Sequence, residues 1–323
     1  MTYLAYRLGR LILLLFGASL LCFLLFELAP GDYLTEMRLN PQLSLETISA
    51  LRIQCGLDRS FVARYSHWLA SVGAGTWGYS FAYDGPVSHL LWNRAGNTLL
   101  LTVTATAMAW PLGIALGTCF AAFRRCIWNR ILGDGLTVLL VATPDLLLAL
   151  LLLLVAVRTG IFPTGGMVSI DFNTMDRWGK FKDLVAHLCL PVLCLVVSQL
   201  PSIVAHVRTT MSDVLDSPFL RAARGLGIPR ARLLVRHALV AAVNPLISLF
   251  GLSLGSLLSS SLLVEAVMGW PGLGRLLLES ILARDVHVVI GATIASTLLA
   301  GVGSVVADTL LRINDPRIRE ATT

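Results

Sequence analysis

The sequence predicts an all-α integral membrane protein with six transmembrane helices. Three observations lead to this fold class: 56% of the 323 residues are hydrophobic, only 14% are charged, and the mean hydropathy is +0.77. Soluble domains carry charge on about a quarter of their residues, so this composition falls outside that class. Six apolar stretches are also long enough for a membrane-crossing helix, which needs about 20 residues. They lie near residues 9–29, 98–122, 132–157, 184–206, 239–264 and 286–311.

The first apolar stretch ends at Ala29, where Pro30 and Gly31 stop a helix and start a turn. It is too long for a secretory signal peptide and has no clear cleavage motif. We therefore expect residues 1–30 to be a retained first transmembrane helix.

An external segment is expected over residues 31–95. Its opening, from Ser44 to Leu51, has the pattern of a capped helix, and a second amphipathic helix holds Tyr65, Trp68 and Leu69. The aromatic side chains favour a helix at the membrane surface, although a small soluble cap over the spans has the same pattern. The remaining transmembrane core covers residues 96–312, followed by a cytoplasmic tail at 313–323.

The distribution of basic residues favours a multi-pass membrane protein with both termini in the cytoplasm. The net charge is +6, but the basic residues are divided among loops rather than gathered in one patch, so we expect no nucleic-acid partner. The total number of basic residues is only slightly higher in the segments expected on the cytoplasmic side than in those expected outside. The external basic residues are spread over long segments, where the positive-inside rule is weakest.

Cysteine and histidine positions give no sign of a disulfide framework or a metal site. The six cysteines fall mostly in or beside apolar spans, and the six histidines lack the spacing of metal ligands. We expect no metal ion and no cofactor bound by this chain.

Residues 208–238 form a basic loop that interrupts the apolar sequence. Ser217 and Pro218 have the pattern of an N-cap and first-turn proline, Gly225 or Gly227 can end the short helix, and Pro229 opens another. Ala222 and Ala223 predict a flat side on which another protein can approach. The expected contact residues are Pro218, Arg221, Ala222, Ala223, Arg224, Gly225, Gly227 and Arg232. A positively charged cytoplasmic loop of any membrane protein remains the alternative.

This loop resembles the Glu-Ala-Ala loop of permease subunits of binding-protein-dependent ABC importers, in the peptide- and nickel-type (dipeptide/oligopeptide permease B-like) subgroup. The core of that motif appears here as Arg221-Ala222-Ala223-Arg224-Gly225, with Arg221 in place of the glutamate. Further matches run in order along nearly the full length. They are Gly56-Leu57-Asp58-Arg59, Gly78-Tyr79-Ser80-Phe81, Asn97-Thr98-Leu99, Thr143-Pro144, Gly160 to Gly166, His187-Leu188, Gly269 to Arg275 and Asp315-Pro316-Arg317. Asp145 and Ala95-Gly96 depart from the usual residues of the subgroup.

The resemblance implies a type I importer permease fold with a cytoplasmic coupling helix between the fourth and fifth spans. It also implies a second permease subunit (a heterodimer is favoured), two ATPase subunits or domains, and an external solute-binding protein. The chain itself has no P-loop, because its only two lysines, Lys180 and Lys182, lie outside any such motif. ATP and Mg²⁺ are therefore expected on the partner ATPases.

A solute pathway through the membrane is expected to be lined by polar, mostly uncharged residues, since buried charge is costly there. Serines and threonines recur at helical spacing in the fifth and sixth spans, and Asp145 beside Pro144 is the deepest carboxylate. Simple helix–helix packing explains the same stripes. Gly251 and Gly255 form a row of small residues that permits such packing. The candidate lining residues are Asp145, Ser253, Ser256, Ser260, Thr293 and Thr297.

The turn at Gly269–Gly272 and a short amphipathic helix over 273–284 form a second external feature, with Leu276, Leu277 and Ile281 on one side. This segment either contacts the external binding protein or is a re-entrant support for the last two spans. The candidate contact residues are Trp270, Pro271, Glu279 and Asp285, with the two acids expected on the exposed side.

Two other classes of protein fit less well. An ion-coupled secondary transporter usually has inverted repeats and deep charge pairs, which this sequence lacks. An intramembrane enzyme would need a nucleophile, zinc or aspartyl motif, and none is present. The favoured function is peptide import, with import of nickel chelates or glutathione as the alternative. The chain is expected not to be an enzyme.

Overall fold

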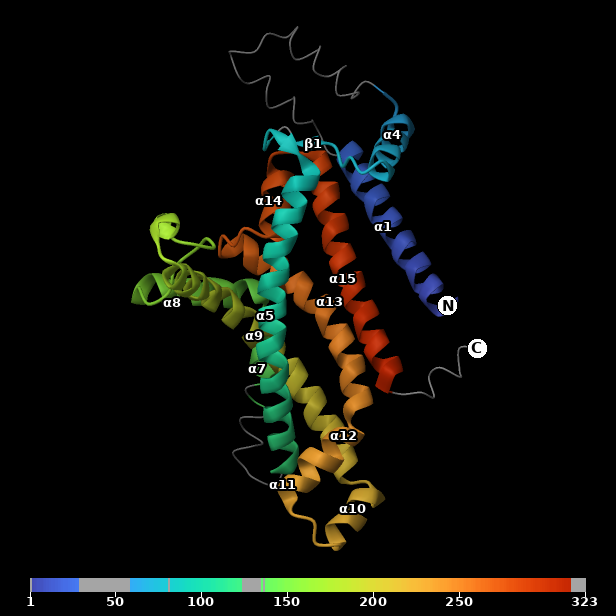
Figure 1. The fold of residues 1–323 in the computed structure, drawn as a ribbon, viewed down its shortest axis with the longest axis vertical. Helices are drawn as coiled ribbons and strands as arrows, with labels where there is room; N and C mark the ends of the chain where they lie inside the picture. The colour runs from blue at the N-terminus through green and yellow to red at the C-terminus, as the bar shows by residue number, and fades with distance from the viewer. Residues whose placement is uncertain (1, 29–58, 81, 124–134, 136, 315–323) are drawn as a thin grey trace. The chain divides into compact units, whose positions relative to one another are not determined.

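The computed structural model describes residues 2–28, 59–80, 82–123, 135 and 137–314, and this part of the protein is largely α-helical (Figure 1). The motif at Gly56–Asp58, the helix expected from Ser44 and the motif at Asp315–Arg317 lie outside these residues. Five helices in the described part are long and apolar enough to cross a membrane. Their candidate spans are Tyr6–Leu28, Val87–Ala122, Arg177–Leu215, Val243–Val267 and Val286–Asn314.

The chain divides into two compact units. One unit contains residues 1–98 and 271–299, and the other contains residues 99–270 and 300–323.

In the first unit, α4 (Phe61–Gly73) packs by its aromatic face against α1 (Thr2–Leu28). The rings of Tyr65 and Trp68 are buried beside Phe23, with centroids 5.1 and 5.3 Å away. The Tyr65 hydroxyl is also 3.0 Å from Ser19 Oγ, and Arg64 pairs with Glu27. The predicted amphipathic helix is confirmed. Its tyrosine and tryptophan face α1, which leaves Leu69 on the exposed side.

The first unit also contains a short hairpin and a short helix, α14 (Leu273–Leu282). Strand β1 (Tyr79–Ser80) pairs antiparallel with β2 (Gly85–Pro86), and α5 (Val87–Ala122) follows at once. Helix α5 therefore begins well before residue 98, where the second span was expected to start. Helix α14 then leads to α15 (Val286–Asn314). Gly78 has φ +95°, and a Cβ there would lie 2.7 Å from His287 Cδ2, so both the turn and the packing require glycine.

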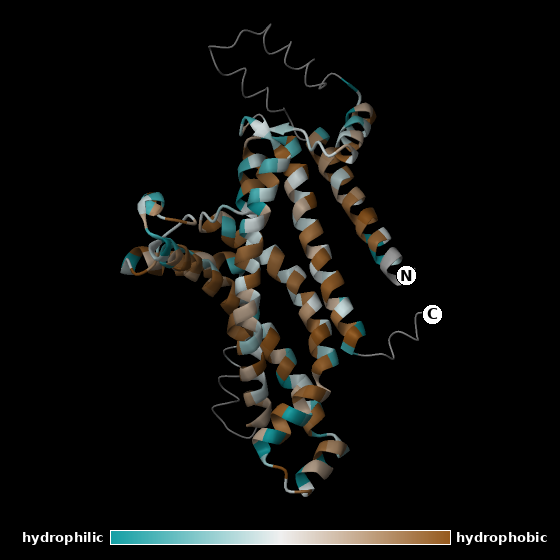
Figure 2. Cartoon of the chain, viewed as in Figure 1, coloured by the Kyte–Doolittle hydropathy of each residue, from teal (hydrophilic) through white to brown (hydrophobic). Residues whose placement is uncertain are grey.

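In the second unit, the long helix α9 (Arg177–Leu215) packs against α7 (Thr137–Ala142), α8 (Asp145–Thr159) and α13 (Val243–Val267). Figure 2 shows how hydrophobic residues dominate these helices, as expected for segments that meet one another and lipid. Leu195, Ile203 and Met211 of α9 are fully or almost fully buried in the core of this unit.

The expectation of one continuous third span over 132–157 is wrong. The helix stops after Ala142 and restarts at Asp145, because Pro144 has an extended ψ of 139° and caps α8 instead of continuing α7. Proline lacks the N–H that a helix interior needs, and it also disfavours helical geometry at the preceding residue.

The fourth span is longer than the expected 184–206. Asp176 caps α9 by accepting a hydrogen bond from the Gly179 N–H at 2.9 Å, so the helix starts at Arg177 after the 3₁₀ turn η2 (Ile170–Thr174). Its far end runs on to Leu215. The apolar pattern alone misses these polar end turns.

Candidate functional site

The basic loop forms a bridge between the end of α9 and the start of α13, and we call residues 216–238 the coupling segment (Figure 1). Ser217 accepts a hydrogen bond from the Leu220 N–H at 3.4 Å, and Pro218 occupies the first turn of α10 (Pro218–Gly225). Gly227 adopts φ +75° just after the helix. The predicted cap and left-handed turn are both confirmed, with Gly227 rather than Gly225 in the left-handed conformation.

Helix α10 has one face in the protein core and one in solvent. Leu220 is fully buried and Ala223 is 7% exposed, so this face packs α10 into the hydrophobic core of the second unit. The prediction that Ala222 and Ala223 share a flat accessible side is therefore wrong for Ala223. Phe219, Ala222 and Leu226 lie on the exposed side, and the exposed fraction of Leu226 reaches 83%.

The remaining residues predicted for the coupling segment are all accessible. They are Pro218, Arg221, Arg224, Gly225, Gly227 and Arg232. The exposed stripe is thus apolar along its centre and flanked by arginines, a composition typical of a surface that another protein covers.

After the exposed stripe, a series of short helical segments leads the chain to α13. Helix α11 (Arg230–Arg232) passes into a π-helical turn, η3 (Leu233–Ala238), and then α12 (Leu239–Ala241). Arg230 donates a hydrogen bond to the carbonyl of Ala122, and its guanidinium lies 4.6 Å from the Phe123 ring centroid. The coupling segment is therefore fastened to α5 as well as to α9 and α13.

A polar seam joins three helices of the second unit around Asp145. Its Oδ1 accepts a hydrogen bond from Ser198 Oγ of α9, and its Oδ2 accepts one from Ser260 Oγ of α13, both at 2.5 Å. Asp145 is the first residue of α8, where the helix dipole also favours a negative charge. Both carboxylate oxygens are therefore used in contacts within the chain.

Two other serines predicted to line the pathway extend this seam along α13. Ser253 Oγ accepts a hydrogen bond from Trp110 Nε1 at 3.1 Å, and Ser256 Oγ lies 3.3 Å from Gln199 Oε1. Ser256 is exposed, whereas Ser260 is buried. The stripe of serines thus contributes to helix packing and, at Ser256, also reaches the surface of the chain.

Thr293 and Thr297 belong to α15 in the first unit. Each hydroxyl donates to the carbonyl four residues earlier, on Val289 at 2.8 Å and Thr293 at 2.7 Å. Both side chains are half-buried. A threonine bonded in this way presents its methyl group and the acceptor lone pairs of its hydroxyl oxygen to its surroundings.

At the predicted external segment, Glu279 of α14 connects the helix to the hairpin. Its carboxylate accepts hydrogen bonds from the Tyr83 hydroxyl at 2.6 Å and from Arg275 Nε at 2.7 Å. Burial and the hydrogen bond to this carboxylate raise the pKa of Tyr83 to about 12. Burial acts to raise the pKa of Glu279, but the bonds from Tyr83 and Arg275 outweigh it and leave that pKa lowered.

The predicted exposure of Asp285 is wrong. Asp285 is 3% exposed, accepts a hydrogen bond from Ser80 Oγ at 2.7 Å, and lies 3.3 Å from the Val288 N–H at the start of α15. Trp270 is completely buried, and Pro271 is half-buried with its carbonyl bonded to Asn97. The buried face of α14 is formed by Leu273, Leu276 and Ser280, whereas Ile281 is exposed. Among these contact candidates, Glu279 and Pro271 are the accessible ones.

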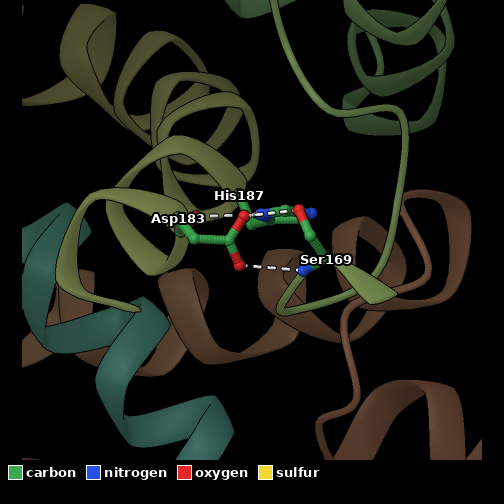
Figure 3. Close-up of polar contacts among 3 residues, drawn as sticks. All are labelled: Ser169, Asp183 and His187. Carbon is green, nitrogen blue, oxygen red and sulfur yellow. Dashed lines mark hydrogen bonds and ion pairs between the residues drawn. The ribbon is translucent and has the colours of Figure 1, made fainter. Parts of the chain in front are cut away.

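Ser169, Asp183 and His187 form a polar cluster that sequence reasoning did not identify (Figure 3). Asp183 accepts hydrogen bonds from the N–H of Ser169 at 2.8 Å and from its hydroxyl. His187 Nδ1 lies 2.8 Å from the Asp183 carbonyl, which can only accept, so this nitrogen carries the proton. Because the serine donates to the carboxylate and not to the imidazole, the cluster fastens a loop to α9 and does not activate a nucleophile.

The sequence of the chain matches a known protein family and several known proteins. Residues 109–320 match the family model described as binding-protein-dependent transport system inner membrane component. The chain is 34% identical over 310 residues to the oligopeptide transport system permease protein AppB of Bacillus subtilis (strain 168), covering 94% of this chain and 95% of the relative. It is 32% identical over 330 residues to the dipeptide transport system permease protein DppB of Escherichia coli (strain K12), covering 97% of each.

Among solved structures, a chain of the MetNI methionine ABC transporter, in inward-facing conformations, has a similar fold. The TM-score is 0.58 at 16% sequence identity, and the match covers 71% of this chain and 97% of that one. At this identity the likeness concerns the fold alone. It agrees with the predicted type I importer permease architecture.

Proposed function

Because the chain belongs to the family of binding-protein-dependent transport system inner membrane components, we propose that it forms half of the translocation pathway of an ATP-driven peptide importer. The peptide class rests on relatives that are named as oligopeptide and dipeptide permeases and that match almost end to end. The observation that carries the mechanism is the exposed apolar stripe of α10, held between α9 and α13.

The energy for transport comes from partner subunits in this proposal. Two ATPase subunits bind ATP and Mg²⁺, a second permease completes the pathway, and an external binding protein delivers the peptide. The stripe of Phe219, Ala222 and Leu226 is the contact for one ATPase, with Arg221 and Arg224 at its edge.

Force then passes from the ATPase to the spans through short, rigid connections. Leu220 and Ala223 fix α10 to the second unit, and Arg230 fixes the following turn to α5. A displacement of α10 must therefore move the ends of α9 and α13 together. This geometry supports alternating access, in which closure of the ATPases tilts the attached helices and opens the pathway outward.

The proposed topology has six spans in the bacterial inner membrane, with both termini in the cytoplasm. The two helices α7 and α8 form the third span in spite of the break at Pro144, because together they contribute 21 residues, 17 of them apolar, and a membrane-crossing helix needs about 20 residues. The coupling segment and its arginines then lie in the cytoplasm, as the positive-inside rule favours. Glu279 of α14 lies on the opposite side, where the binding protein contacts the permease.

Ser256, which is exposed, and Thr293 and Thr297, which are half-buried, are the proposed contacts for solute as it passes. Asp145, Ser253 and Ser260 act as the polar packing that keeps α5, α8, α9 and α13 in register. Uncharged hydroxyls suit peptides of varied sequence, since they bond to backbone groups without selecting one side-chain charge.

Replacing Ala222 with tryptophan tests the ATPase contact. Ala222 is exposed, so the new side chain leaves the fold intact but holds a partner surface away from α10. We expect the variant permease to assemble in the membrane, lose most of the co-purified ATPase and lose peptide uptake. The matched control is Ala63→Trp, at an exposed alanine of α4. Normal ATPase recovery and uptake with Ala222→Trp would contradict the proposal.

A further inference from the structure

An exposed aromatic and basic surface lies around the start of α9, and we call it the aromatic–lysine surface. It consists of the exposed residues Ile170, Trp178, Phe181 and Lys182 and the half-buried residues Phe172 and Lys180. Trp178 is 60% exposed and Phe181 is 56% exposed, although large aromatic side chains are usually covered. The surface also contains both lysines of a chain whose other 23 basic residues are arginines.

The lysines lie beside aromatic rings rather than beside carboxylates. Lys182 Nζ is 5.4 Å from the centroid of the Trp178 ring, and Trp178 stacks on Phe181 at 5.5 Å. Lys180 Nζ is 5.5 Å from the Phe172 ring. Within the described residues neither ammonium is in an ion pair, so both can bind an external anion.

The neighbouring acids are arranged so that they do not neutralise these lysines. Asp176 caps the helix through the Gly179 N–H, and Asp183 accepts both hydrogen bonds from Ser169. Asp171, in the turn η2, is exposed but forms no ion pair with either ammonium in the described part of the chain. The surface therefore offers two free cationic groups beside apolar rings.

Its position on α9 corresponds to the edge of a bilayer. The apolar part of α9 runs over residues 184–207 and is about 36 Å long at the helical rise per residue, against about 30 Å for the hydrocarbon core. Trp178, Phe181 and Lys182 come immediately before this part. Their exposed side continues along the helix as an exposed apolar stripe of Val185, Cys189 and Leu193, at a spacing of four residues.

The geometry points to a binding site for the headgroup phosphate of an anionic glycerophospholipid. Trp178 and Phe181 lie at the interface between headgroups and acyl chains, where aromatic rings are enriched. Lys180 and Lys182 extend from them to donate hydrogen bonds to phosphate oxygens. A lipid is favoured over a protein because the stripe of Val185, Cys189 and Leu193 extends the surface into the span, along the path of an acyl chain.

The site lies in the outer-facing leaflet if the proposed orientation holds, and only this assignment of leaflet depends on the proposed function. Such an anchor would fix one end of α9, whose other end carries the coupling segment. The pathway helices would then pivot about the lipid contact when the ATPases move α10.

Acetylation of the two lysines measures the binding directly. The whole transporter is reconstituted in nanodiscs of phosphatidylcholine, with or without phosphatidylglycerol, and treated with an uncharged amine-reactive reagent. Mass spectrometry of the peptide that contains Lys180 and Lys182 gives the rate. Phosphatidylglycerol should slow acetylation about fivefold at each lysine, and high salt should remove the protection.

The double variant Trp178→Ala/Phe181→Ala distinguishes lipid binding at this site from the general attraction of lysines to an anionic membrane. It keeps both lysines but removes the rings that hold them at the interface, so the protection by phosphatidylglycerol should be lost. Equal rates in the two lipid compositions, or full protection in the double variant, would overturn the proposal. A photoreactive residue at Ile170 gives the second readout: capture of phospholipid is expected, and capture of the binding protein or the second permease instead would also overturn it.

Discussion

Asp145 holds the broken third span to two other helices at once. Its two oxygens accept hydrogen bonds from Ser198 and Ser260, which are 53 and 115 residues away along the chain. A hydrogen bond to a charged group contributes about 1.5–3 kcal/mol, and a buried partner left without its bond costs a similar amount. Pro144 interrupts the helix between α7 and α8. The Asp145 carboxylate fixes the start of α8 by its hydrogen bonds to α9 and α13.

We predict that Asp145 and Ser260 contribute to stability as a pair. Asp145→Asn and Ser260→Ala should each lower the thermal unfolding temperature of the purified complex, and the double variant should lose no more than Asp145→Asn alone. The expected coupling free energy between the two substitutions is about 1 kcal/mol, since each single substitution already breaks the hydrogen bond between Ser260 and Asp145. Ser259→Ala, at an exposed serine on the same helix, should have little effect. Additive losses would contradict the prediction.

At this scale the sequence identified Asp145 as unusual but could not name its partners. A carboxylate beside a proline inside an apolar stretch is visible in the sequence alone. The two serines are found only when three helices come together, and α13 offers several serines at similar spacing. For the same reason Asp285 was expected to be exposed, whereas Ser80, more than 200 residues away, buries it.

Close helix packing in the second unit depends on Gly113 and Gly117 of α5. A Cβ on Gly113 would lie 2.4 Å from Ile203, and one on Gly117 would lie 2.7 Å from Val207 and 3.0 Å from the Val204 carbonyl. The row expected at Gly251 and Gly255 is only half correct. A Cβ on Gly251 would lie 2.6 Å from the Ala307 Cβ, whereas a Cβ on Gly255 would meet no neighbouring atom within 4 Å.

Alanine substitutions at two glycines provide a matched comparison of this packing. Gly117→Ala should destabilise the complex by about 1–3 kcal/mol, because neither the Val204 backbone nor α5 can move away without cost. Gly255→Ala should be neutral or stabilising by up to about 1 kcal/mol, since alanine favours the helix and meets no neighbour. Thermal unfolding of both variants checks this; equal destabilisation, or a stable Gly117→Ala variant, would show that α5 and α9 pack differently.

Most of the elements could be predicted from the sequence, but their ends could not. Ser217, Pro218 and Gly227 are local signals, and they gave the coupling segment its correct shape. The break before Asp145 and the early start of α9 are set by Pro144 and by the Asp176 cap, which an apolar average over 20 residues hides. Polar end turns of this kind are the part of a long span that hydropathy misses.

For the whole molecule, one helical path connects the exposed stripe of α10 to the spans. The path runs from α9 through the coupling segment to α13, and the seam around Asp145 joins those two helices again at the start of α8. The order of motifs along the chain was enough to predict the family. The inward face of Ala223 and the outward face of Leu226 required the structure, because α10 has only eight residues and Leu226 follows its last residue.

The most direct test of the account places a photoreactive amino acid at Leu226 in cells that produce the complete transporter. We expect a covalent product between the permease and an ATPase subunit, with a yield that changes when ATP is added to inverted membrane vesicles prepared from these cells. Products formed only with lipid or with a protein on the external side, and none with the ATPase, would contradict it.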